Sequence, residues 1–80
     1  MGARKGDPVA AHWESRAKNL LKAELKRRGL SYADLVVRLS DLQIRETERN
    51  LTNKISRGGF TAAFLLQCMV AIGATELHLD

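Results

Sequence analysis

Apolar residues recur along this chain at the three- and four-residue spacing of amphipathic helices, in four successive blocks. Asp7 followed by Pro8 is a helix start signal, so the first helix begins there or only near Glu14. Gly29 ends the pattern after a run of basic residues, as a helix C-terminus prefers. The side chains predicted to face inward on this helix are Trp13, Ala17, Leu20, Leu21 and Leu25.

The next two blocks predict short helices with a gap between them. Ser31 is the N-cap of the second helix, whose inward stripe is Tyr32, Leu35, Leu39 and, at its end, Leu42. The periodicity lapses after residue 41 and resumes at Thr47, the N-cap of a third helix that Gly58 closes. Leu51 and Ile55 are its inward pair, and the connection before it is about five to seven residues long.

The fourth block is apolar around much of its circumference. Thr61 caps this helix, Gly73 stops it, and the side chains predicted to face the core are Phe64, Leu65, Cys68, Met69 and Ile72. Leu66 and Val70 form a second apolar arc, which is typical of a helix that is central or shared with a partner. We therefore expect a homodimer that associates through this helix or through the C-terminus.

Length and charge limit the function classes. The 80 residues suffice for one domain, so we expect a disordered tail at 1–6 and a single helical domain at 7–80. The net charge of +4, from 13 basic and 9 acidic side chains, favours a polyanionic partner. No segment has the length of a membrane span, and one cysteine with no signal peptide favours the cytoplasm.

Three segments resemble the phage-repressor-like (xenobiotic-response-element type) helix-turn-helix family: RRGLSYADLVVRL at 27–39, KISRG at 54–58 and FTAAFLLQCMVAIGA at 60–74. The segment NKISRGGFTAAFLLQCMVAIG is more similar to a group of small bacterial helix-turn-helix-like domains of unknown function. The resemblance implies an all-α bundle of four to five short helices that binds double-stranded DNA as transcriptional regulators do, with the third helix in the major groove. SDLQIRE at 40–46 replaces the family's tighter turn, so the turn between the second and third helices is lengthened.

The third helix carries the candidate DNA contacts. With Leu51 and Ile55 inward, its outer arc is polar or basic and has no carboxylate. Arginine can bond guanine, and asparagine adenine, through two atoms each. The residues predicted to contact bases are Arg49, Asn50, Thr52 and Asn53. Phosphate contacts are expected from Arg45, Thr47, Lys54, Ser56 and Arg57.

Other chemistry has little support in the sequence. Glu24 lies on an inward arc, where an ion pair with Arg28 or Arg38 is expected. Cys68 is expected to be a buried structural thiol, because it and the two histidines lack the spacing of a zinc site. We expect no metal, no cofactor and no enzymatic activity. The alternative is a helical protein-interaction module that has lost DNA contact, which the lengthened turn and Glu48 allow.

Overall fold

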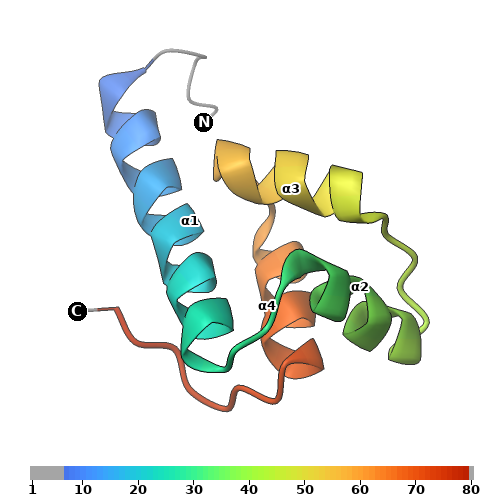
Figure 1. Ribbon diagram of the computed structural model, residues 1–80. Helices are drawn as coiled ribbons and strands as arrows, with labels where there is room; N and C mark the ends of the chain where they lie inside the picture. Colours follow the sequence, from blue (N-terminus) through green and yellow to red (C-terminus); the bar gives the residue numbers. More distant parts are fainter. Residues whose placement is uncertain (1–6, 80) are drawn as a thin grey trace.

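The computed structural model describes residues 7–79, which fold into four helices and no strands (Figure 1). They are α1 (Pro8–Arg27), α2 (Tyr32–Asp41), α3 (Glu48–Arg57) and α4 (Ala62–Ala71). The predicted all-α class with helices in this order is confirmed, although only α2, α3 and α4, with 10 residues each, are short and α1 has 20. The predicted tail at residues 1–6 lies outside the described residues.

Every helix begins at the polar residue that the sequence indicates. The side chains of Asp7, Ser31, Thr47 and Thr61 each accept a hydrogen bond from a backbone N–H of the first turn. Ser31 and Asp34 form a full capping box, in which each side chain bonds the other residue's backbone N–H. Each cap stabilises its helix by about 1 kcal/mol. Helix α1 starts at Pro8, so the later start near Glu14 is ruled out.

All four helices end at a residue with positive φ, and three of them, α1, α2 and α4, end in the same Schellman turn. In α1 and α4 the residue with positive φ is glycine, Gly29 at +68° and Gly73 at +79°. In α2 it is Gln43, with φ of +66°. The N–H of Gln43 donates to the carbonyl of Ser40, and the N–H of Ile44 donates to that of Leu39, which is the Schellman pattern. The lengthened turn predicted at 40–46 begins later, at residue 42, because Ser40 and Asp41 still belong to α2, and it is an ordered helix end followed by the extended approach to Thr47.

The core contains ten buried apolar side chains, all of which lie on the predicted inward stripes. They are Leu21, Leu25, Leu35, Leu39, Leu51, Ile55, Phe64, Cys68, Met69 and Ile72. Burying one such side chain fully contributes about 1.5–3 kcal/mol, so the four helices depend on one another for stability.

Two residues predicted to face inward do not. Trp13 is 57% exposed, because it lies about 80° around α1 from buried Leu21, while Glu14 lies only about 20° away and takes the place beside Gly58 of α3. The Trp13 ring instead lies between His12, edge-on at 5.1 Å, and the Arg16 guanidinium at 5.6 Å. Leu42 is 41% exposed, because it caps the C-terminus of α2 rather than continuing its buried stripe.

Glu24 is buried, at 2% exposure, and is paired within its own helix. Arg28 Nε lies 3.5 Å from Glu24 Oε1, and Arg27 Nη2 lies 3.3 Å from Oε2. The expected pair with Arg28 is confirmed, whereas that with Arg38 is wrong. Arg27 takes that place, since an arginine three residues along the same helix reaches the carboxylate without any tertiary alignment.

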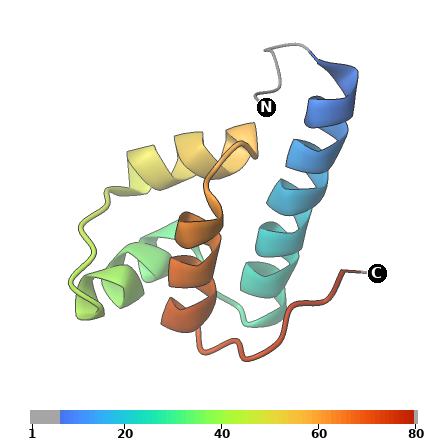
Figure 2. The same ribbon diagram turned by 180° about the vertical axis from the view of Figure 1, so that it is seen from behind.

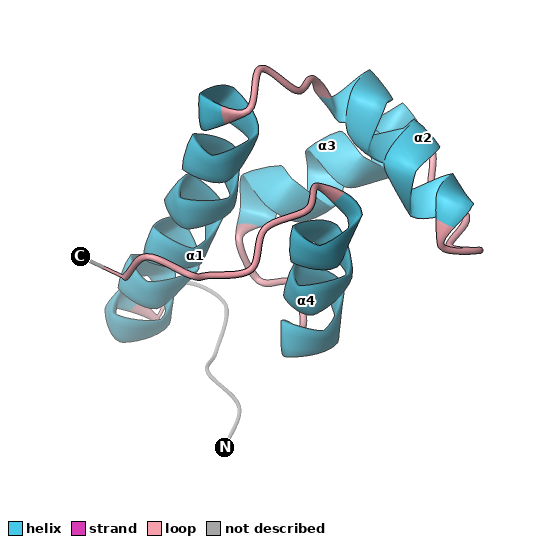
Figure 3. Ribbon diagram, turned by 90° about the horizontal axis from the view of Figure 1, so that it is seen from below, coloured by secondary structure: helices cyan, strands magenta, loops and turns pink. Residues whose placement is uncertain are grey.

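Helix α3 lies across the end of the molecule at which α4 begins (Figures 1 and 2). It packs against α1 and α2, and α2 also packs against α4. Seen from below, α4 lies at the edge of the bundle beside α2, with α3 farther back (Figure 3). One side of α3 and one side of α4 are thus left uncovered.

Candidate nucleic-acid interface

The outer face of α3 carries the side chains predicted to contact DNA. Leu51 and Ile55 are both 0% exposed, so they fix the rotation of the helix about its axis. At 100° per residue, Arg49, Asn53 and Arg57 then lie opposite the buried pair, and all three are exposed. Asn50 and Ser56 flank this row and are exposed as well. The fold therefore brings the predicted arc together on one solvent-facing surface.

Acidic groups are absent from this surface of α3. The helix's one carboxylate, Glu48, belongs to the first turn and lies three residues before Leu51, so it is on the side of the buried residues. An acid there also suits the positive end of the helix dipole. The outer row itself presents hydrogen-bond donors and amides, which suits the edges of base pairs.

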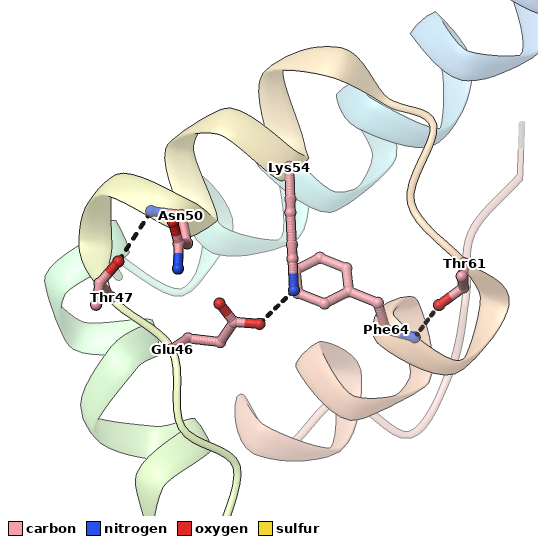
Figure 4. Close-up of polar contacts among 6 residues, drawn as sticks. All are labelled: Glu46, Thr47, Asn50, Lys54, Thr61 and Phe64. Atoms are coloured by element: carbon pink, nitrogen blue, oxygen red, sulfur yellow. Dashed lines mark hydrogen bonds and ion pairs between the residues drawn. The ribbon is translucent and has the colours of Figure 1, made fainter.

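Two threonines of this region already bond to the helix backbone. Thr47 Oγ1 accepts the N–H of Asn50 at 3.1 Å, as Figure 4 shows, so its hydroxyl hydrogen remains available to a phosphate. Thr52 Oγ1 donates to the carbonyl of Glu48 at 2.9 Å, so this hydroxyl can offer DNA only its acceptor electrons. Arg45 is exposed in the connection before α3.

Lys54 is held in a contact that the sequence did not indicate. Its Nζ lies 2.5 Å from Glu46 Oε2 and 5.0 Å from the centre of the Phe64 ring, between α3 and α4 (Figure 4). The Glu46 side chain is only 9% exposed. This cluster fixes the end of the lengthened turn against both helices. The Lys54 side chain is still 48% exposed, so its remaining N–H donors can reach a phosphate, although Glu46 offsets part of its charge.

Backbone contact with α1 fixes the other end of α3. Gly58 ends the helix with a φ of +72°. A Cβ atom at Gly58 would lie 2.1 Å from the carbonyl oxygen of Glu14, far inside van der Waals contact. Only glycine allows the backbone at the end of α3 to approach the backbone of α1 this closely. Helix α3 is thus held by the Glu46–Lys54 cluster, which ties the turn before the helix to its last turn, and by the contact of Gly58 with α1.

Cys68 lies in the core with no exposed surface. Burial raises the pKa of its thiol to about 12, and the nearby Glu46 carboxylate contributes to that rise. The expected buried structural thiol is therefore what the structure shows. The two histidines lie elsewhere: His12 contacts Trp13, and His78 lies 3.7 Å from Glu76.

Of the described helices, none combines the length and the apolar character that crossing a membrane requires. No curated protein and no solved structure matches this chain. A family model described as a domain of unknown function (DUF6471) matches residues 13–77, which contain α2, α3, α4 and most of α1. This agrees with the expected similarity to small domains of unknown function, whereas the relationship to phage-repressor-like regulators stays a prediction. The chain belongs to this family of domains of unknown function.

Proposed function

We propose that this chain is a DNA-binding domain that places α3 in the major groove of double-stranded DNA, as a cytoplasmic transcriptional regulator does. The observation that supports this most directly is the outer row Arg49, Asn53 and Arg57, which is exposed and has no acid beside it. Anchoring by the Glu46–Lys54 cluster and by α1 adds support, because a recognition element must be held rigidly to discriminate between bases.

Each exposed residue has a role in this proposal. Arg49 and Asn53 contact base edges, and Asn50 and Thr52 contact bases from the flanks. Phosphates are held by Arg57, Ser56, Thr47 and Arg45, which set the position of α3 without reading sequence. Lys54 joins them through the N–H donors that Glu46 leaves free, with a charge that Glu46 partly offsets. A second copy of the chain, bound through α4, is the other proposed partner.

The test is selection from random-sequence duplexes, followed by titration of the selected duplex over a series of salt concentrations. We expect an enriched sequence, and an affinity for it that falls about 5- to 140-fold in Arg49→Ala or Asn53→Ala, since a bidentate base contact discriminates by about 1–3 kcal/mol. Arg57→Ala should weaken binding to all sequences alike and reduce the salt slope by about 1.

Arg38→Ala is the matched control, because Arg38 is an exposed arginine on α2, outside the outer row of α3. It should leave both affinity and sequence preference unchanged. Selection that enriches no sequence, with binding that is equally weak in the Arg49 and Arg38 variants, would contradict the proposal.

The second candidate is a protein-interaction module that does not contact DNA. It is favoured by the exposed Trp13 ring with Arg16 against it, because tryptophan and arginine dominate the energetics of protein interfaces. A failed DNA selection, together with a partner whose binding is lost in Trp13→Ala and kept in Arg49→Ala, would establish this candidate.

A further inference from the structure

The uncovered side of α4 is both apolar and uncharged. Leu66 and Val70 are 64% and 62% exposed, and Ala63 and Gln67 beside them are exposed too. The helix Ala62–Ala71 contains no acidic or basic residue, whereas the other three described helices contain several each. The Gln67 amide is the only polar side-chain group that these four residues offer to water. Depletion of charge is what distinguishes the centre of a protein interface from the remaining surface.

The spacing of these side chains fits pairing with an identical helix. Ala63, Leu66 and Val70 are separated by three and then four residues, which is the a, d, a sequence of one heptad. A β-branched residue at position a with leucine at position d favours two parallel strands. Val70 at a and Leu66 at d have that composition, whereas Ala63 at the other a position is small and not β-branched.

We propose that two copies of this chain pair along α4, with the two helices parallel about a two-fold axis that runs beside them. Each seam residue then meets its own counterpart: Ala63 meets Ala63, Leu66 meets Leu66 and Val70 meets Val70. The charge of the chain favours this face over others, because two copies with a net charge of +4 repel each other wherever basic surfaces meet. Contact along an uncharged helix opposes no like charges.

The parallel orientation has a consequence for α3 that rests on the proposed function. Helix α3 lies across the end of the molecule at which α4 begins (Figures 1 and 3). A two-fold axis along α4 keeps the α3 helices of both copies at that same end, so one DNA duplex can contact both of them. Antiparallel pairing would send the two α3 helices to opposite ends. The paired form thus reads two half-sites of one DNA segment.

The contact is small, which sets its strength. Leu66 and Val70 are its only large exposed side chains, while a stable interface buries about 800 Å² on each partner. The pair is therefore weak between free molecules. Two copies on adjacent half-sites meet at an effective concentration of order millimolar, which is sufficient to make weak pairing visible as cooperative binding.

Disulfide formation tests the pairing without DNA. Ala63→Cys places a thiol on the seam, and Ala33→Cys places one at an exposed alanine of α2 as the matched control. The native Cys68 does not compete, because it is fully buried. In a glutathione redox buffer, Ala63→Cys should form covalent dimers about tenfold faster than Ala33→Cys at equal protein concentration. Val70→Asp added to Ala63→Cys should lower that rate to the control level, with an unchanged circular dichroism spectrum.

Two results would overturn the proposal. Equal rates for Ala63→Cys and Ala33→Cys would show that the copies do not pair along α4. Faster crosslinking of Gln67→Cys than of Ala63→Cys would indicate antiparallel helices, in which the two Ala63 positions lie about 10 Å apart along the axis.

A DNA measurement separates this proposal from the proposed function. On a duplex with two inverted copies of a selected half-site, Val70→Asp should lose cooperativity while its affinity for one half-site stays unchanged. Unchanged cooperativity in Val70→Asp would overturn the pairing and leave DNA binding intact. A chain that selects no sequence would overturn the proposed function, and the crosslinking rates would still decide whether the copies pair.

Discussion

The contact between Gly58 and α1 predicts that one glycine of this fold is far less replaceable than two others of similar conformation. Gly29, Gly58 and Gly73 all have φ between +68° and +79°. A Cβ atom at Gly29 or Gly73 would meet nothing within 4 Å, whereas at Gly58 it would lie 2.1 Å from the Glu14 carbonyl oxygen. The three positions thus separate conformational strain from steric overlap.

The magnitudes follow from these two costs. Left-handed backbone costs a residue with a side chain about 1–2 kcal/mol, and the lost flexibility of glycine in the unfolded chain returns about 0.5–1 kcal/mol. Gly29→Ala and Gly73→Ala should therefore each lower the free energy of unfolding by about 1 kcal/mol. Gly58→Ala bears the same cost plus about 1–3 kcal/mol for forcing α3 away from α1, so its total should be about 2–4 kcal/mol.

Urea unfolding followed by far-ultraviolet circular dichroism measures these differences directly. The two control variants should retain the slope of the wild-type transition and shift only its midpoint. If Gly58→Ala is no more destabilised than Gly29→Ala, the close approach of α3 to α1 does not constrain the fold, and the account of how α3 is anchored is wrong.

Three further predictions concern the turn, the ion pair and the thiol. Gln43→Gly should raise the free energy of unfolding by about 0.5–1 kcal/mol in urea titrations, because φ is +66° at this position, and a loss of stability would contradict the reading of the turn. Lys54→Met should lower the free energy of unfolding by about 1–3 kcal/mol, because it leaves the Glu46 carboxylate buried and unpaired. Adding Glu46→Gln should recover part of that loss. A double-mutant cycle that shows no coupling between the two positions would contradict a stabilising ion pair. Burial raises the pKa of Cys68 from 9.0 to about 12. As pH rises, the thiol therefore ionises in the unfolded chain before it ionises in the folded one. The free energy of unfolding should fall by about 1.4 kcal/mol per pH unit above pH 9. Cys68→Ala should lose this part of the pH dependence, and identical pH dependence in the two proteins would show that Cys68 does not cause it.

Much of the fold could be predicted from local signals. The caps at Ser31, Thr47 and Thr61 act within one helical turn, so residue type and spacing suffice to locate them. Burial on the inward stripes follows equally from periodicity, which is why all ten core residues could be predicted. The outer face of α3 could be predicted for the same reason, since Leu51 and Ile55 fix its rotation.

What could not be predicted depends on how the elements meet. The pair between Glu46 and Lys54 joins residues eight positions apart across a non-helical turn, where no periodicity relates them. The Schellman turn at the end of α2 has Gln43 where such turns usually have glycine, so the sequence does not predict an ordered turn there. Trp13 lies at the edge of the inward stripe of α1, and only the contact of Gly58 with Glu14 shows which side of the helix faces α3 at this level.

The first turns of α1 also determine what the chain's single tryptophan can report. Trp13 lies near the start of α1 with 57% of its side chain exposed, and helix ends of this kind open locally at a small fraction of the free energy of global unfolding. Amide hydrogens there should exchange with solvent much sooner than those around Leu21 or Leu25. Tryptophan fluorescence will therefore follow fraying of one helix end, and its transition will come before the cooperative loss of helix in the rest of the domain.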